Sequence, residues 1–298
     1  MPHGTVAVLA TDATFDRAAV LAALAMSDTE EAHLDIHCIG RCHGPSAGAE
    51  ALAAEALAAD GLAADGLAAG PIAPAGRPDD RAALARAEAL EAALRPVIPR
   101  HRRNIAFHPQ ALRDGSAGAQ LASTIRFADW IVAAAPLDPQ DRRLQIAGLK
   151  AGLLMGGVPV MLVPREGAET AHAPARIAVA WDGSRGALAA VRAALPLLRR
   201  AGLVDVIVVD PDIRHGDRSD PGGDLALFLA RNGARVEINV LARSRPRIPE
   251  VLVRHCLDTA AEAVVMGACG HARSGRALFG TTSRGMMRLS KIPLILSR

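Results

Sequence analysis

Glycine and hydroxyl residues near the C-terminus are spaced in a way that suits phosphate binding. From Val264 the sequence reads VVMGACGHARSGRALFGTTSRGMMRL, so Gly267 is followed after two residues by Gly270, and after nine more by Gly280 and Thr281. Glycine lacks a Cβ, so a loop built on these residues lets the backbone approach a ligand closely. A helix that starts after Gly280 presents free N–H groups and the positive end of its dipole to an anion.

Side chains around these glycines strengthen the pattern. The hydroxyls of Thr281, Thr282 and Ser283 can cap the predicted helix or bind phosphate oxygens. Cationic groups lie between the glycines and can lean over a polyphosphate: His271, Arg273 and Arg276.

A second wall for the same site is predicted at the end of an earlier strand. The apolar run Arg176–Ala180 ends just before Asp182, and Val208 lies near the end of the following strand. Open α/β sheets bind ligands at the carboxyl ends of their strands, where a carboxylate can accept hydrogen bonds from ribose hydroxyls and a backbone edge can meet an adenine. Each piece also has a purely structural interpretation, as a turn, a helix N-cap or a solvated arginine face. Their convergence on one end of one sheet favours nucleotide or phosphate binding.

The elements that must position these residues occur twice. Short apolar runs alternate with helical patterns in both halves, which is typical of βαβ units with a parallel sheet covered on both faces. The matching segments are Thr5–Ala10 before Thr11-Asp12 and Arg176–Ala180 before Trp181-Asp182, then Ala128–Ala135 and Ala261–Ala268, then Pro159–Val163 and Pro293–Leu296. We therefore predict two domains, residues 1–164 and 175–298, joined by a Gly- and Pro-containing linker at 164–174.

The second half is the more regular of the two. Strands are predicted near 176–180, 204–209, 235–241, 263–267 and 293–297, and helices near 184–200, 222–232, 248–260 and 282–290. The first half carries an Ala-rich insertion, 47–70, of low complexity, to which we assign no chemistry. It is followed by an amphipathic helix predicted over Asp79–Leu94 and ended by Pro96.

The whole chain resembles a tandem universal stress protein. The second half carries the family's nucleotide-binding pattern, Gly-x2-Gly-x9-Gly-[Ser/Thr], at Gly267, Gly270, Gly280 and Thr281. The segment IAVAWDGS, which starts at Ile177, is similar to the opening strand of the family. The resemblance implies two doubly wound α/β domains, each a five-stranded parallel sheet in the order 3-2-1-4-5.

The resemblance also implies a ligand, which is ATP, or AMP or another adenylate, with Mg²⁺ or Mn²⁺. Asp182 would hold the ribose, while Val208 and Met266 would border the adenine. The complete candidate set is Ala180, Asp182, Val208, Met266, Gly267, Gly270, His271, Arg273, Gly280, Thr281 and Thr282.

The first half departs from this pattern. In the segment AAAPLDPQDRRLQIAGLK, Ala134 and Leu137 stand where the first two glycines would be, and only Gly148 lies near the third. Leu137 would fill the phosphate space, and the neighbouring prolines remove N–H donors. Lys150 could still attract an anion. We expect this half to keep the fold, to lose strong nucleotide binding and to pair with the second half as a pseudo-dimer; a homodimer through the strand Pro293–Ser297 is the alternative.

Cysteine and histidine residues form two further groups of interest. A zinc or redox site is conceivable at His33, His37, Cys38, Cys42 and His43, but a strand over 34–39 would send neighbouring side chains to opposite faces. Cys269 lies inside the predicted phosphate loop beside Arg273, where its thiol could become oxidisable.

Composition limits the remaining functions. Aromatic residues make up 2% and the net charge is +3, which argues against nucleic-acid partners. The apolar run 151–164 is too short to span a membrane, and the four cysteines suit a reducing compartment, so a cytoplasmic protein is expected. We find no catalytic constellation. The leading hypothesis is an ATP-binding regulatory stress protein with unknown protein partners; the alternatives are a slow ATPase or nucleotidyl or phosphoryl transferase, and a non-binding scaffold.

Overall fold

The computed structural model describes residues 4–27, 32–42, 78–113, 117–135, 142–164, 174–211, 220–268 and 279–298. The first half contains β1 (Thr5–Ala10), α1 (Arg17–Met26), β2 (His33–Cys42), α3 (Pro78–Leu94), the 3-10 turn η1 (Arg95–Val97), β3 (Ile105–Arg113), α4 (Ala117–Ile125), β4 (Trp130–Ala134), α5 (Arg142–Lys150), the π-helical turn η2 (Ala151–Gly156) and β5 (Val160–Val163). The predicted helix over 79–94 is confirmed, and the Ala-rich insertion lies outside the described residues.

The second half follows the same plan. It contains β6 (Arg176–Ala180), α6 (Arg185–Arg200), β7 (Leu203–Val209), α7 (Gly223–Arg231), β8 (Val236–Leu241), α8 (Ile248–Asp258), β9 (Ala263–Gly267), α9 (Thr281–Leu289) and β10 (Leu294–Ser297). Every bound predicted for this half is within two residues of the observed one. In the ranges given above, no helix is long and apolar enough to cross a membrane.

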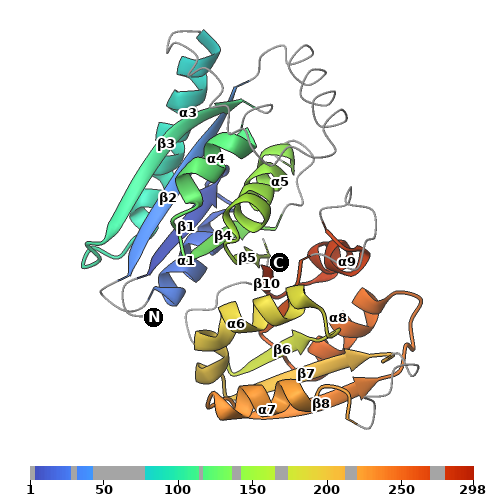
Figure 1. Ribbon diagram of the computed structural model, residues 1–298. Coiled ribbons are helices and arrows are strands. Elements are labelled where there is room, and N and C mark those ends of the chain that lie inside the picture. The colour runs from blue at the N-terminus through green and yellow to red at the C-terminus, as the bar shows by residue number, and fades with distance from the viewer. Residues whose placement is uncertain are drawn as a thin grey trace.

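Ten strands form one continuous sheet. Its order is β3-β2-β1-β4-β5-β10-β9-β6-β7-β8, so each half has the predicted order 3-2-1-4-5. Strands within each half run parallel, whereas β5 and β10 pair antiparallel, with Leu162 opposite Leu294 and Val160 opposite Leu296. Figure 1 shows the two half-sheets meeting at this pair, with the C-terminus beside it.

The last strand is therefore not an edge strand. The sequence suggested that Pro293–Ser297 could pair with a second copy of the chain, but β10 is hydrogen-bonded to β9 on one side and to β5 on the other. Both of its neighbours lie in the same chain, so the tandem arrangement supplies internally the pairing that a homodimer would supply between copies. The exposed edges of the sheet are β3 and β8.

Two layers of apolar side chains cover the two faces of the sheet. Alternation along the strands sends Val6 and Val8 to one face and Ala7 and Leu9 to the other. The first layer includes buried residues of α1, α3, α6 and α7, and the second those of α4, α8 and α9. Each layer continues from one half into the other, so the two halves share both layers of the core.

One helix end in the second half carries a residue that its backbone disfavours. Helix α8 ends in the hydrogen-bond pattern of a Schellman motif, in which the Ala261 N–H donates to Cys256 O (2.9 Å) and the Ala260 N–H to Leu257 O (3.3 Å). Ala260 lies at the position normally taken by glycine and has φ of 53°. A Cβ in this left-handed conformation costs roughly 1 kcal/mol.

We predict that Ala260→Gly raises the free energy of unfolding by about 1 kcal/mol, because glycine adopts positive φ without strain. Denaturant unfolding monitored by circular dichroism measures the change. The matched control is Ala226→Gly inside α7, which is expected to lower stability by about 1 kcal/mol. Equal destabilisation by both substitutions would contradict the assignment of strain to Ala260.

Candidate functional site

The carboxyl ends of three neighbouring strands bring part of the predicted site together. Ala180 on β6 is in register with Met266 on β9 and with Ile207 on β7, next to Val208. The side chains of Val208 and Met266 are buried in the layers on opposite faces of the sheet. A ligand at this end of the sheet can therefore meet both residues only through their backbone edges, which is the role expected for Val208.

Asp182 sits in a tight turn between β6 and α6. Its Oδ1 accepts a hydrogen bond from the Ser184 N–H (3.0 Å), and Gly183 between them has φ of 73°. Ser184 in turn caps α6, because its Oγ accepts from the Ala187 N–H (3.1 Å). The capping interpretation is thus correct for Ser184. Asp182 remains solvent-exposed, so a carboxylate of fixed position is presented at the strand end.

Gly267 has a packing reason to be glycine. A Cβ there would lie 2.9 Å from the Ala187 N and 3.0 Å from the Gly186 carbonyl carbon, both in the first turn of α6. From the sequence, Gly267 was predicted to let the backbone approach a ligand closely. In the structure its missing Cβ allows β9 to approach α6.

The start of α9 is tied back to the end of β9. The N–H of Gly280, the N-cap residue, donates to Ala268 O (3.2 Å), and the buried Ser283 Oγ donates to Gly267 O (2.9 Å). The Ser283 hydroxyl was expected to cap the helix or bind phosphate; it does not cap the helix, and its proton is donated to Gly267 O. Thr281 and Thr282 are more accessible. Several predicted loop residues lie outside the described part of the chain: Cys269, Gly270, His271, Arg273 and Arg276.

A cavity of about 740 Å³ opens beside the first turn of α9, and Thr281 and Thr282 are among its lining residues. Ala180, Asp182, Val208, Met266 and Gly267 are not among them. The predicted site residues therefore fall into two groups at one end of the sheet, one on β6, β7 and β9 and the other on α9.

In the first half, a buried carboxylate binds the backbone at the end of the first strand, β1. Asp16 is 1% exposed, and its Oδ2 accepts hydrogen bonds from the N–H groups of Thr11 (2.5 Å) and Asp12 (2.8 Å) at the end of β1. Burial raises the pKa of Asp16 to about 6, against the lowering effect of these N–H donors. The N-cap residue is Asp16 in α1 and Ser184 in α6. The first half thus has a buried carboxylate at the helix start where the second half has a serine.

Gly148, which was expected near the place of the third glycine, does not lie in a loop. Helix α5 starts at Arg142, so Gly148 lies well inside it, and a Cβ there would be 2.6 Å from Leu9 Cδ1. Gly148 is therefore a packing residue. Lys150 is the exposed last residue of α5. Leu137 lies outside the described residues.

A second carboxylate at the strand ends was not predicted from the sequence. Asp210 directly follows β7 and has φ of 50°, while its N–H donates to Leu241 O (2.9 Å). Positive φ in a residue other than glycine is uncommon, although aspartate is among the residues that tolerate it best. Asp210 is exposed at the same end of the sheet as Asp182. The sequence did contain a signal for Asp210, because it stands two residues after Val208, which was predicted to contact the adenine.

A buried polar network was also missed. Asp205 on β7 is fully buried; its Oδ2 lies 2.8 Å from His255 Nε2, and its Oδ1 accepts from Asn239 Nδ2 (2.8 Å). The three residues come from β7, β8 and α8, so no local sequence pattern connects them. The network anchors α8 to the sheet.

The histidine and cysteine residues of β2 do not form a common ligand set. Cys38 is buried with the layer that contains α1, whereas Ile39 lies in the opposite layer, as the alternation of a strand requires. Burial raises the pKa of the Cys38 thiol to about 12, and burial with the nearby Asp80 raises that of Cys42 to about 11. Burial also lowers the pKa of His37, stacked on His108, to about 4. Among the described residues, no group of three such side chains could hold a metal ion.

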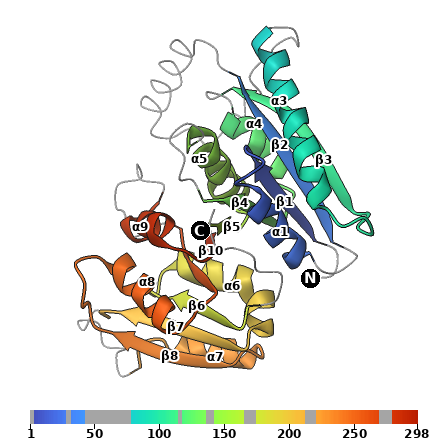
Figure 2. The same ribbon diagram turned by 180° about the vertical axis from the view of Figure 1, so that it is seen from behind.

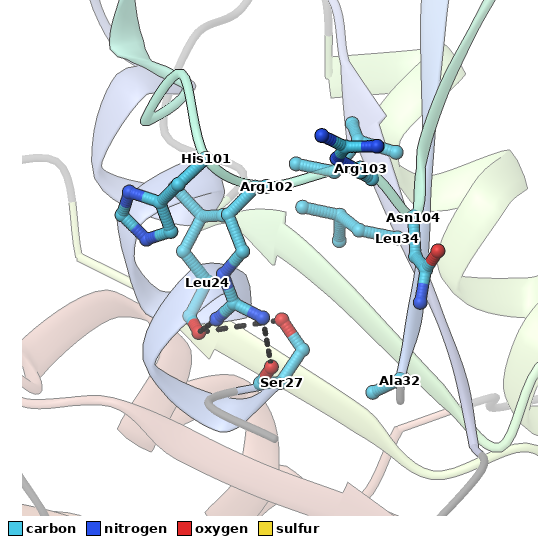
Figure 3. Close-up of a pocket in the computed structure, with 9 residues that line it drawn as sticks. Leu24, Ser27, Ala32, Leu34, His101, Arg102, Arg103 and Asn104 are labelled. Carbon is cyan, nitrogen blue, oxygen red and sulfur yellow. Dashed lines mark hydrogen bonds between the residues drawn. The ribbon is translucent and has the colours of Figure 1, made fainter. Parts of the chain in front are cut away.

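A second cavity, of about 410 Å³, lies at the opposite end of the sheet, where β2 and β3 begin. Figure 3 shows the Arg102 side chain reaching across it to the end of α1, where its guanidinium donates to Ser27 O (2.6 Å) and Leu24 O (3.0 Å). These bonds satisfy carbonyls at a helix C-terminus and complement its dipole. We conclude that Arg102, which lines this cavity, caps the C-terminus of α1.

Comparisons with known proteins identify the fold. Residues 175–298 match the model of the universal stress protein family. A universal stress protein from Archaeoglobus fulgidus DSM 4304 is 12% identical, with a TM-score of 0.62 over 99% of this chain and 96% of that one. A putative universal stress protein from Pseudomonas aeruginosa UCBPP-PA14 is 15% identical, with a TM-score of 0.50 over 99% and 93%.

A shorter universal stress protein, solved in complex with cAMP, is 18% identical, with a TM-score of 0.31 over 42% of this chain and 98% of that one. No curated protein matches the sequence significantly. The C-terminal half therefore belongs to the universal stress protein family, and the whole chain has the fold of two such domains in tandem.

Asp16 should make stability depend on pH. Its pKa is raised to about 6 in the folded state from 3.8, so the folded state binds this proton more tightly than the unfolded state. The contribution to stability is greatest below about pH 4 and is lost as pH rises through about 6, with a total on the order of 3 kcal/mol. We predict that urea unfolding of Asp16→Asn lacks this component. A wild-type stability that rises relative to Asp16→Asn between pH 4 and 6 would contradict it.

The Asp205–His255 pair should be sensitive to loss of one partner. His255→Leu leaves a buried carboxylate with Asn239 as its remaining hydrogen-bond donor in the network, so we expect the free energy of unfolding to fall by about 3 kcal/mol. The double variant Asp205→Leu/His255→Leu removes both hydrogen-bonding partners and should be less destabilised than His255→Leu alone. Thermal and urea unfolding measure both values. A loss below about 0.5 kcal/mol in the single variant would show that the pair contributes no net stability.

Proposed function

We propose that this tandem universal stress protein is a regulatory protein that binds an adenine nucleotide, preferentially ATP, in its C-terminal half. The adenosine would lie against the carboxyl ends of β6 and β7, with Asp182 accepting hydrogen bonds from the ribose hydroxyls. The phosphates would lie at the start of α9, near Gly280, Thr281 and Thr282.

The observation that carries the proposal is the attachment of α9 to the end of β9. The bonds from Gly280 to Ala268 and from Ser283 to Gly267 fix the helix start directly beyond the strand end. The N–H groups in the first turn of a helix have no partner within the helix and favour an anion. Asp182 is fixed near the end of the adjacent strand β6. A nucleotide needs such a pair of sites, one for the ribose and one for the phosphates.

Restriction to the C-terminal half is supported by the Asp16 carboxylate of the first half. The backbone N–H groups at the end of β1 already donate to this carboxylate. A ligand at this strand end would have to compete with it for the same donors. In the second half the N-cap residue of α6 is Ser184, which carries no charge.

A divalent cation fits the same arrangement. Mg²⁺ commonly binds between phosphate oxygens and one or two carboxylates, and it retains several waters. Asp210 is an exposed carboxylate at the same end of the sheet, and it is not assigned to the ribose. Mg²⁺ or Mn²⁺ would be held by Asp210 together with the phosphates and would neutralise part of their charge.

We predict that Asp182→Ala weakens binding of Mg²⁺-ATP at least tenfold, because the ribose hydroxyls lose their charged acceptor, worth roughly 1.5–3 kcal/mol. Calorimetric titration with ATP, AMP and cAMP measures the effect and the preference among nucleotides. The matched control is Asp12→Ala, which removes the corresponding aspartate of the first half. Asp12 likewise accepts backbone N–H bonds, from Thr14 (2.8 Å) and Phe15 (2.9 Å), so both variants lose a turn contact.

Gly280→Val tests the phosphate position separately. Gly280 has φ of −58°, which valine can adopt, so the variant should fold and lose ATP affinity while AMP is affected less. Equal ATP binding by Asp182→Ala, Asp12→Ala and the wild type would refute the proposed ribose contact. No binding at millimolar ATP would favour the scaffold alternative, and turnover with Mg²⁺ or Mn²⁺ would favour the enzyme alternative.

A further inference from the structure

We infer that the cavity between helices α5, α8 and α9 is a second ligand site, which binds a small organic anion with an oxyanion headgroup and an apolar body. This inference does not rest on the proposed nucleotide site. The cavity, of about 740 Å³, is within the size range of small-molecule sites. Figures 1 and 2 show α5 of the first half and α9 of the second half side by side in both views.

Cationic side chains dominate the polar part of the lining. Arginines are contributed by the β8–α8 loop (Arg243 and Arg247) and by α9 (Arg284 and Arg288), whereas Glu250 is the acidic lining residue. The lining therefore has a net charge of +3. Among the described residues, Arg247, Arg284 and Arg288 have no ion-pair partner.

Guanidinium groups on two different segments suit an oxyanion. Each arginine can donate two parallel hydrogen bonds to a phosphate or carboxylate group. Arg284 and Arg288 are four residues apart on α9, so they lie on one side of the helix, and their like charges are brought together without compensation. A bound anion would relieve that repulsion.

The remaining lining is apolar and comes from both halves. Ile146 and the buried Leu149 belong to α5, and the buried Phe279 immediately precedes the cap of α9. An inorganic anion would leave this apolar surface in contact with water. An organic anion would cover it and gain about 25 cal/mol for each Å² removed from water. The apolar and cationic parts together specify the class of ligand.

A ligand here would contact both tandem halves at once. The first half supplies apolar contacts through α5, and the second half supplies the charges. Helix α5 of the first half would thus contribute residues to a ligand site whose charged groups belong to the second half. Because Thr281 and Thr282 also line the cavity, anions at this site and at the nucleotide site would repel each other.

The test uses hexyl phosphate, hexanoate and inorganic pyrophosphate as probes in calorimetric titrations of the full chain. We expect hexyl phosphate to bind at least tenfold more tightly than pyrophosphate, and the hexanoate affinity to show whether a carboxylate headgroup suffices. The double variant Arg284→Ala/Arg288→Ala should lose at least tenfold in hexyl phosphate affinity. Its matched control, Arg192→Ala/Arg231→Ala, removes two exposed arginines of α6 and α7 and should bind as the wild type does.

Two further variants test separately the contribution of the first half and the location of the bound probe. Ile146→Gln should reduce hexyl phosphate binding and leave pyrophosphate binding unchanged; no effect on either probe would overturn the contribution of the first half. Gly280→Val, which blocks the phosphate position of the nucleotide site, should leave hexyl phosphate binding intact, because Gly280 does not line the cavity. Loss of hexyl phosphate binding in Gly280→Val would place the probe in the nucleotide site and overturn the inference, as would equal binding by the two arginine double variants.

Discussion

The antiparallel pairing of β5 with β10 is the interaction on which the arrangement of the molecule depends. Each strand is the last of its half, buried on both faces and short, and each would expose unpaired N–H and C=O groups if its half were isolated. Pairing them satisfies both edges and continues the two apolar layers across the junction. The same pairing sets α5 opposite α8 and α9, so the cavity between the halves is a geometric consequence of the joined sheet.

The two halves share a fold but differ at the positions where a ligand would bind. At the start of the first helix of each half the difference is one buried carboxylate, Asp16, against Ser184. At the start of the last helix, Gly148 of the first half lies inside α5 and packs on Leu9, whereas Gly280 of the second half caps α9. The first half thus has internal hydrogen bonds and packing at these positions.

Most of the fold could be predicted from the sequence because the strands are continuous apolar runs. The runs over 176–180 and 263–267 have the same bounds in the structure. The sequence could not reveal contacts between distant segments. Asp205 and His255 are 50 residues apart and meet only because α8 lies over β7. Gly267 fitted a phosphate-loop pattern, yet its tight contact is with α6, since spacing along the chain does not specify which backbone a glycine approaches.

Helix α9 is the element through which ligand binding at the strand ends of the second half would affect the first half. Its start is hydrogen-bonded to the end of β9 through Gly280 and Ser283, and the cavity beside it is lined in part by α5. A phosphate at its first turn would act on a helix that is short and is held at its N-terminus by two hydrogen bonds. This helix also carries Arg284 and Arg288, which have no ion-pair partner among the described residues. A shift of α9 would change the cavity and its contacts with the first half. On the proposed function, the first half would then respond to the nucleotide state of the second half without binding a nucleotide itself.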